Sequence, residues 1–418
     1  LGEPLFLDVV AALKGSAFND VPVYGGRFGL GSKDTVPAHI IAVYNNMAAP
    51  QPKPEFTLSI EDDVTHLSLP VTENPDTTPA GTTSCKFWGL GSDGTVGANK
   101  DSIKIIGDNT DMFAQGYFFY DSKKSGGITV SHLRFGSSPI TSTYLINKAN
   151  FVACHCPSYV TKYDMVQDLV PGGTFLLNCI WTPDQLDSQL PASMKRYIAE
   201  NNIHFYIING IKIAEEVGLP GRASTILQSA FFAISGILPV EKAIELMKAA
   251  VVKKFSKKGE AVVNANFAGI DRGAQEIVKV DVPDSWKTAE DAPRRLEVPT
   301  DRPEMKKFVK EILDPVGRLH GDDLPVSAFA DRADGVYPAG SAAFEKRGIA
   351  ITVPQWDGTK CAQCNLCAMV CPHAVIRPIA MNAEEAAAAP EGTTMVKHKR
   401  ADYQYALIAV SYTHLTLP

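Results

Sequence analysis

The sequence of 418 residues lacks both the long apolar runs of a membrane protein and the excess of basic residues of a nucleic-acid-binding protein. No stretch of about 18 apolar residues occurs, so we expect no transmembrane helix. No secretory signal pattern is visible either. The 40 basic and 46 acidic residues give a formal net charge of −6, which leaves no basic footprint for nucleic acid and suits small soluble partners.

The chain also lacks a disulfide framework. Four of its 8 cysteines form one cluster, and the others are scattered at Cys85, Cys154, Cys156 and Cys179. This usage favours a reducing, cytoplasmic compartment. The cysteines on either side of His155 have no second ligand pair nearby, so buried or inert thiols are favoured over a metal site. With 45% hydrophobic and 21% charged residues, the composition is that of an ordinary globular protein of several domains.

The clustered cysteines follow the spacing C-x2-C-x2-C-x3-C-P, and they are Cys361, Cys364, Cys367 and Cys371. Three cysteines on one tight loop can hold three corners of a [4Fe–4S] cluster, and in two-cluster ferredoxins the fourth cysteine ligates the other cluster. A structural zinc site is the alternative, but it usually separates two C-x2-C pairs by a dozen or more residues. The spacing therefore predicts an iron–sulfur site, although a second cysteine run is lacking.

Residues 81–282 alternate between short strand patterns and amphipathic helix patterns. Strands are predicted at 85–90, 114–120, 128–134, 151–155, 174–179 and 204–208. Helices are predicted at 99–106, 163–169, 193–200, 211–216, 224–234 and 240–253. This alternation predicts a doubly wound α/β domain, with a largely parallel sheet and helices on both faces.

The flanking segments are less regular. Residues 1–50 are expected to be the end of another α/β domain, with helices at 5–13 and 36–47 and a strand at 21–24. A Pro- and Thr-rich linker follows at 51–80. Residues 283–345 are predicted to be an irregular connector with one helix at 303–312, and residues 346–411 part of a ferredoxin-like α+β module.

A Gly-rich loop from Gly89 to Lys100 follows a predicted strand and opens a predicted helix. Glycines let backbone amides approach an anion, and the helix N-terminus adds a positive dipole end. The string G-x-G-x-x-G is a weak signal by itself, and the acidic residues about 20 positions on, Asp108 and Asp111, fall in a turn. The missing GK[ST] excludes a Walker loop. A phosphate or pyrophosphate ligand is favoured, and a merely tight β–α turn is the alternative.

Other polar positions are weaker candidates. A charged hairpin carries Lys124 and Ser125, and Arg222 and the pair Asn264/Asn266 are expected at the ends of elements. His132 and Arg134 would point the same way on one strand. A satisfied structural pair is the default interpretation for these two residues.

Taken in order, these segments resemble the single-chain pyruvate:ferredoxin (flavodoxin) oxidoreductases of the 2-oxoacid oxidoreductase family. The resemblance rests on residues 89–100, 120–136, 149–165, 211–232 and the cysteine run. It implies an enzyme that converts pyruvate and coenzyme A to acetyl-CoA and CO2, with thiamine diphosphate, Mg and two [4Fe–4S] clusters. Ferredoxin or flavodoxin would accept the electrons, and a cytoplasmic homodimer of anaerobic metabolism is implied.

The resemblance also assigns domains and residues. Residues 1–50 look like the C-terminal part of a transketolase-C-like domain, 81–282 like the gamma-type CoA-binding domain, 283–345 like the connector domain and 346–411 like the first half of the ferredoxin domain. The implied CoA contacts are Asp93, Gly94, Thr95, Val96, Asn99, Lys124, Ser125, Arg222 and Asn264. Cys361, Cys364 and Cys367 would ligate one cluster and Cys371 the other. No catalytic residue is assigned.

Two departures from the family pattern qualify this assignment. Residues 412–418 do not fit the family and are expected to be a non-native tail, and the family's thiamine-binding domains do not appear. The chain is therefore expected to be an internal fragment that lacks pyruvate oxidation by itself. A non-catalytic ferredoxin-like electron-transfer protein on a nucleotide-binding scaffold, and a structural zinc protein, are the alternatives.

Overall fold

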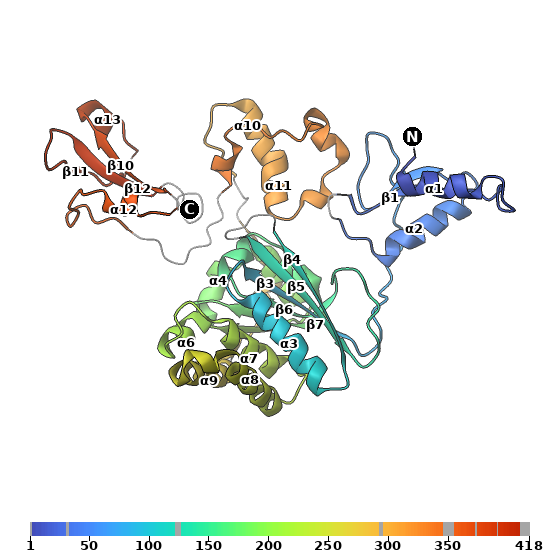
Figure 1. Ribbon diagram of the computed structural model, residues 1–418, viewed down its shortest axis with the longest axis horizontal. Coiled ribbons are helices and arrows are strands. Elements are labelled where there is room, and N and C mark those ends of the chain that lie inside the picture. Colours follow the sequence, from blue (N-terminus) through green and yellow to red (C-terminus); the bar gives the residue numbers. More distant parts are fainter. Residues whose placement is uncertain are drawn as a thin grey trace. The chain divides into compact units, whose positions relative to one another are not determined.

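The protein divides into two compact units in the computed structural model, Leu1–Tyr337 and Pro338–Pro418 (Figure 1). The structure describes residues 2–30, 33–121, 127–291, 296–345, 355–372, 374–390 and 392–409. Within them, no helix combines the length and apolar character needed to cross a membrane.

The first unit is built on a seven-stranded sheet with the order β4-β5-β3-β6-β7-β8-β9. Its four parallel strands are β3 (Thr83–Leu90), β6 (Ala149–Cys154), β7 (Leu169–Asn178) and β8 (His204–Ile208). Antiparallel strands β4 (Phe113–Tyr120), β5 (Ile128–Gly136) and β9 (Val278–Lys279) complete its edges. The predicted α/β class is confirmed, and the parallel pairing is confined to the centre of the sheet.

Helices cover one face of this sheet (Figure 1). They are α3 (Thr95–Asn109), α6 (Gly210–Glu216), α7 (Ser224–Ser235), α8 (Val240–Phe255) and α9 (Glu260–Gln275). Their core centres on Phe87, Phe151 and Phe231, whose ring centroids lie 5.0–5.8 Å apart. Helix α9 was not predicted. It packs closely on α7 because Gly273 has no side chain, since a Cβ there would lie 2.4 Å from the carbonyl oxygen of Ile226.

The other face of the sheet carries α4 (Leu186–Gln189), α5 (Ala192–Glu200) and short 3₁₀ turns at Pro157–Thr161, Met165–Asp168 and Asp284–Thr288. The helix predicted at 163–169 is wrong. The chain makes a single 3₁₀ turn there because β7 begins directly afterwards, at Leu169. Phe205 packs between Phe175 and Trp286 on this face, with centroid distances of 5.3 and 6.4 Å.

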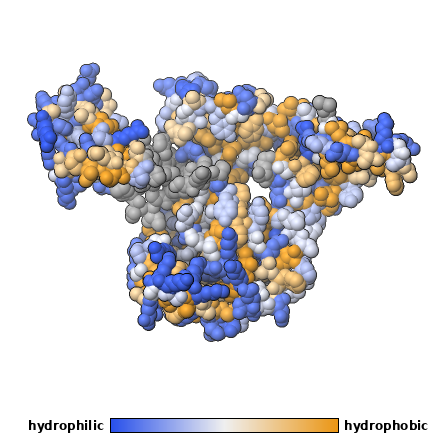
Figure 2. Space-filling view, viewed as in Figure 1, coloured by the Kyte–Doolittle hydropathy of each residue, from blue (hydrophilic) through white to orange (hydrophobic). Residues whose placement is uncertain are grey.

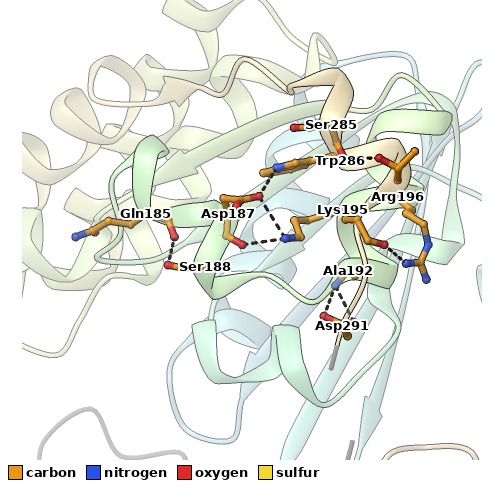
Figure 3. Close-up of polar contacts among 11 residues, drawn as sticks. Gln185, Asp187, Ser188, Ala192, Lys195, Arg196, Ser285, Trp286 and Asp291 are labelled. Atoms are coloured by element: carbon orange, nitrogen blue, oxygen red, sulfur yellow. Dashed lines mark hydrogen bonds and ion pairs between the residues drawn. The ribbon is translucent and has the colours of Figure 1, made fainter. Parts of the chain in front are cut away.

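Hydrogen bonds fasten the start of the connector onto α4 and α5 (Figure 3). Helix α5 has no capping side chain of its own at Pro191. The Asp291 carboxylate accepts from the Ala192 amide at 2.8 and 2.9 Å instead, which places negative charge at the helix N-terminus. The indole of Trp286 donates to Asp187 at 2.9 Å, and Lys195 donates to the same residue.

The N-terminal part of this unit contains α1 (Pro4–Leu13), β1 (Gly25–Arg27), α2 (Pro37–Ala48) and β2 (Glu55–Thr57). The strand predicted at 21–24 is wrong, because the strand that forms is β1, directly after these residues. It pairs with β2. The reason is local, since the ring of Phe56 lies 2.5 Å from where a Cβ of Gly26 would be. Phe56, Leu58 and Leu69 join Ala42 in a small core, so part of the predicted linker packs against residues 1–50.

Helix α1 has no buried residue, and its Leu5 is 75% exposed. Phe28, which follows β1, is 65% exposed. Figure 2 shows the apolar surface of this segment.

The connector forms α10 (Pro303–Phe308), which continues through a π-helical turn (Val309–Leu313) into α11 (Asp314–Gly317). This agrees with the helix predicted at 303–312.

The second unit carries the cysteine run. It contains α12 (Leu366–Met369), β10 (Ile376–Met381), α13 (Ala383–Ala387), β11 (Val396–Lys397) and β12 (Gln404–Ala409). The strands form an antiparallel sheet with the order β10-β12-β11. Helix α13 begins with a capping box, in which Asn382 and Glu385 exchange hydrogen bonds of 2.9 and 2.8 Å.

Buried charged side chains on the face of β3 and β5 that carries α4 and α5 are paired within the fold. Lys86 pairs with Asp168, and Arg134 donates to Gln115 and to the carbonyl of Tyr144, both at 2.9 Å. His132 accepts from the amide of Ile146 at 3.1 Å. His132 and Arg134 thus each have hydrogen-bond partners within the fold, as the interpretation of a structural pair requires, although Nε of Arg134 has no partner among the described residues.

Replacing His132 by Asn should flatten the loss of stability in mild acid. Burial, then Lys86 and Arg134, lower the pKa of His132 to about 3, whereas the unfolded chain takes up that proton near pH 6.5. The neutral ring therefore contributes its full stability above pH 6.5, and this stability is lost as the pH falls toward 3. Between pH 7 and pH 5 the resulting fall in the free energy of unfolding is about 2 kcal/mol. Urea unfolding at the two pH values measures it.

His132→Asn cannot titrate but keeps an acceptor for the Ile146 amide. Its free energy of unfolding should therefore fall by about 2 kcal/mol less than that of the parent between the two pH values. His155, which is also buried, remains in both proteins and cancels in the comparison. An unchanged pH dependence would show that His132 does not stay neutral in the fold.

Candidate functional site

A cavity of about 460 Å³ lies at the carboxyl end of β3, where the chain turns into α3. The turn residues Gly91, Ser92, Asp93 and Gly94 line one side. The remaining lining residues come from β3, the first turn of α3 and the β4–β5 hairpin: Leu90, Val96, Gly97, Tyr120, Asp121, Gly127, Ile128 and Thr129. The predicted Gly-rich loop is therefore a wall of a cavity rather than only a tight turn.

The carboxylate of Asp93 holds this loop in shape. It accepts from the amides of Leu90 and Thr95 at 2.9 and 2.7 Å, and from the Thr95 hydroxyl at 2.9 Å. These contacts need a glycine beneath them, because a Cβ at Gly89 would lie 2.6 Å from the Thr95 hydroxyl oxygen and 3.0 Å from the Asp93 carboxylate. Because the carboxylate oxygens of Asp93 already accept hydrogen bonds from the loop, the role of Asp93 is to hold the loop that forms the cavity wall.

His155 extends this network across the sheet. It follows β6, which is the parallel neighbour of β3, and its Nδ1 lies 2.7 Å from the Thr95 hydroxyl. Since the Thr95 proton goes to Asp93, the Nδ1–H of His155 is the donor in this pair. Burial lowers the pKa of His155, with Asp93 opposing the shift, so the ring is neutral. The sequence analysis missed this role; the signal was the position of His155 at the end of a predicted strand.

The neighbouring thiols are buried, as predicted. Cys154 is fully buried and donates to the carbonyl of Cys156 at 3.1 Å, while Cys156 lies 3.2 Å from the hydroxyl of Ser158. Burial raises the pKa of both thiols. None of the 8 cysteines, which all lie in the described part of the chain, forms a disulfide.

The first turn of α3 supplies donors to the cavity. Val96 and Gly97 line it, and the amides of a first helical turn have no acceptor within their own helix. Asn99 lies one turn on and does not line the cavity. It is 3% exposed, and its side-chain amide nitrogen has no partner among the described residues. An N-terminus of this kind attracts an anion such as a phosphate group.

The acidic residues of a dinucleotide fingerprint do not reach the cavity. Asp108 lies in the last turn of α3, at the opposite end of a helix that begins at Thr95. That separation is about 20 Å along the helix axis. The next strand, β4, also pairs only through antiparallel β5. The structure therefore argues against a dinucleotide site of the Rossmann type.

The other predicted contacts are placed less closely. Lys124 and Ser125 lie outside the described residues, although the hairpin ends Asp121 and Gly127 line the cavity. Arg222 is exposed in the turn before α7, and Asn264 is exposed within α9. Neither of these two lines the cavity.

Helix α7 nevertheless contacts the loop. Gly94 adopts a left-handed φ of 90°, and a Cβ there would lie 2.7 Å from the hydroxyl oxygen of Ser224, the first residue of α7. Thr225 then donates to Asn266 at 3.5 Å. The expectation that Asn264 and Asn266 end an element is wrong, because both lie inside α9.

The cysteine loop of the second unit is gathered around Tyr405. The phenol of Tyr405 donates to Asn365 at 2.7 Å, and its pKa is raised by burial and then by the nearby Cys361, Cys367 and Cys364. Left-handed residues Gln363 and Asn365 bend the loop, with φ values of 57° and 60°.

The donor set of this loop fits an iron–sulfur cluster. The Gln363 amide donates to the sulfur of Cys361 at 3.3 Å, a contact that suits a ligating thiolate. No three candidate ligands converge into a metal site within the part of the chain that is described. The spacing of the three thiols nevertheless matches the three-cysteine loop that such a cluster requires.

Comparison with known proteins decides the family. Residues 84–276 match the family described as "Pyruvate ferredoxin/flavodoxin oxidoreductase", 292–350 a "Domain of unknown function", and 353–376 a "4Fe-4S binding domain". The chain is 50% identical over 415 residues to the pyruvate-flavodoxin oxidoreductase of Enterobacter agglomerans, covering 98% of this chain and 34% of that protein. The chain belongs to the pyruvate ferredoxin/flavodoxin oxidoreductase family.

Other relatives agree. The pyruvate:ferredoxin oxidoreductase of Moorella thermoacetica is 52% identical over 391 residues, covering 94% of this chain and 33% of that protein. The mitochondrial pyruvate dehydrogenase [NADP(+)] of Euglena gracilis is 44% identical over 415 residues, covering 97% of this chain and 22% of that protein. The chain thus spans about a third of the first two relatives. The resemblance and the iron–sulfur module predicted from the sequence are confirmed.

Replacing Gly94 by Ala should destabilise the cavity loop, because the left-handed φ of 90° and the 2.7 Å approach to Ser224 both oppose a side chain. The expected loss is about 1–3 kcal/mol in the free energy of unfolding. Urea unfolding followed by the fluorescence of buried Trp88 on β3 would report it.

Gly97→Ala is the matched control. A Cβ at Gly97 meets nothing within 4 Å and the residue lies inside α3, so this change should be neutral or stabilising by up to about 1 kcal/mol. Equal losses in the two variants would contradict the account of the loop.

Proposed function

We propose that this chain supplies the coenzyme A site and part of the electron-transfer path of an enzyme that oxidatively decarboxylates pyruvate. Pyruvate and CoA would become acetyl-CoA and CO2, and two electrons would pass to ferredoxin or flavodoxin. The proposal rests on the 50% identity between this chain and the Enterobacter agglomerans protein. The aligned region covers 98% of this chain, so it includes both the loop cavity and the cysteine module. The Euglena gracilis relative is named for NADP(+), so the choice of acceptor rests on the first two relatives.

The CoA contacts are proposed at the loop cavity. Its loop wall can bind phosphate because the N-terminus of α3 presents the amides of Val96 and Gly97. Asn99, one turn further along α3 and outside the cavity lining, would add its unpartnered side-chain amide. Asp93 and Thr95 would hold the loop, and Gly94 would let it turn toward α7. A cavity of about 460 Å³ suits part of such a ligand.

The rest of CoA would extend over α7 and α9. Arg222 lies two residues before Ser224, whose side chain meets the loop at Gly94. Asn264 lies two residues before Asn266, which accepts a hydrogen bond from Thr225 at the start of α7. Lys124 and Ser125 belong to the same proposal, on the hairpin whose ends line the cavity.

The cysteine module would hold iron. Cys361, Cys364 and Cys367 are the proposed ligands of one [4Fe–4S] cluster, and Cys371 of another. A bound cluster supplies the capacity to accept and release single electrons. Of the chain's own residues, Gln363 would orient the sulfur of Cys361 through its amide, and Tyr405 would fix the loop through Asn365.

The remaining parts of the proposal concern the whole enzyme. Thiamine diphosphate and Mg are proposed as its further cofactors, and no residue of this chain is assigned to them. A homodimer in a reducing, cytoplasmic compartment is proposed as well. The thiols support the compartment, because all 8 are without disulfides.

Titration of the full chain with CoA tests this proposal. Binding is expected by calorimetry, and Asn99→Leu should weaken it about tenfold because the apolar side chain keeps the helix but removes a donor. Asn201→Leu is the matched control, since Asn201 caps the C-terminus of α5, on the opposite face of the sheet from α3. Failure of the parent chain to bind CoA would favour the alternative, a non-catalytic electron-transfer protein on a nucleotide-binding scaffold.

A further inference from the structure

The hairpin wall of the loop cavity carries an aromatic ring. Tyr120, the last residue of β4, lines the cavity and is 55% exposed. It is the only aromatic residue among the described residues that line this cavity. The CoA contacts proposed above do not include this ring. An exposed aromatic ring in a ligand cavity can recognise a flat group of the ligand.

Strand β4 runs along α3 in a regular progression. A Cβ at Gly116 would collide with a side chain of α3, and the ammonium group of Lys100 on α3 lies 5.1 Å from the ring centroid of Phe118. Residues 116, 118 and 120 share one face of the strand, and residues three or four apart share one face of the helix. Tyr120 therefore lies beside the first turn of α3, and Gly97 of that turn lines the same cavity.

Small residues leave a slot between this ring and the loop. Thr129 on β5 pairs with Gly89 on β3 and with Tyr120 on β4. Side chains of directly paired residues point to the same face, and two strand spacings separate β3 from β4 by about 10 Å. No described atom lies within 4 Å of the Cβ position of Gly97. The space between the ring and the first turn of α3 is therefore open.

The two sides of this slot differ in chemistry. The free amides of a first helical turn point out of the N-terminus of α3 and suit a phosphate group. The ring of Tyr120 lies beside that turn and offers a flat face, which stacks on another flat ring. In CoA the adenine base is planar and is joined to phosphate groups, whereas the pantetheine arm is a flexible chain. The slot thus places a base platform next to a phosphate site.

We infer that Tyr120 is the platform on which the adenine ring of CoA stacks, beside the phosphate-binding end of α3. This inference rests on the proposed function and divides the ligand between two regions. The base and the phosphates lie in the loop cavity, and the pantetheine arm leaves it toward α7. Stacking on Tyr120 gives the cavity its preference for an adenine nucleotide over a phosphate group alone.

Calorimetric titration of the full chain with CoA and with 4′-phosphopantetheine, which lacks the adenine nucleotide, tests the inference. Tyr120→Leu should weaken CoA binding about tenfold, because an aliphatic side chain removes the stacking face. The same variant should leave the dissociation constant of 4′-phosphopantetheine unchanged. Tyr120→Phe keeps the ring and should bind CoA within about twofold of the parent chain.

Tyr117→Leu is the matched control. Tyr117 lies on the same strand and is 57% exposed, but it belongs to the other face, where its ring centroid lies 6.4 Å from that of His132. It does not line the cavity, so the same substitution there should leave CoA binding unchanged. Urea unfolding of both variants confirms that the affinities compared are those of folded proteins.

The inference is overturned if Tyr120→Leu binds CoA like the parent chain, or if it weakens 4′-phosphopantetheine binding as much as CoA binding. Equal weakening by Tyr117→Leu would also overturn it. Adenosine 3′,5′-bisphosphate separates the inference from the proposed function. A parent chain that binds this nucleotide through Tyr120 but does not bind CoA would contradict the proposed function and leave the base platform standing. CoA binding that does not depend on Tyr120 would do the reverse.

Discussion

The carboxylate of Asp93 is the contact on which the candidate site depends. By accepting from two amides and one hydroxyl, it closes the turn between β3 and α3 and presents the first turn of the helix to a cavity. His155 completes the arrangement by donating to Thr95 from the neighbouring parallel strand. Without this network, Gly94 would lose the left-handed turn that brings the loop against Ser224, and the wall of the cavity would not form.

The two compact units share a simple design, in which a rigid sheet carries a loop of special backbone geometry. In the first unit the loop begins at the carboxyl end of a parallel strand, where ligands of α/β sheets commonly bind. In the second unit, left-handed Gln363 and Asn365 bend the cysteine loop, and hydrogen bonds tie it to β11 and β12. Function is proposed at these loops because one of them lines the cavity and the other carries the cysteine run.

Sequence pattern was sufficient for features that depend on neighbouring residues. The strands from 85–90 to 204–208, the anion-type loop and the cysteine run were all predicted. The contact between His155 and Thr95 could not be, because it requires the pairing of β3 with β6, which are 58 or more residues apart. Helix α9 was missed because its asparagines and glycines obscure the apolar period, and Gly273 serves its packing on α7. Residues 163–169 have a helical pattern, but the start of β7 leaves room for a single turn.

Amide hydrogen exchange of the full chain with and without CoA tests the central claim most directly, since it locates the ligand. CoA should slow exchange in the loop and first turn of α3, residues 91–97, and leave the amides of α1 and α13 unchanged. Protection confined to other segments, with exchange at residues 91–97 unaltered by saturating CoA, would contradict the assignment of this cavity as the coenzyme A site.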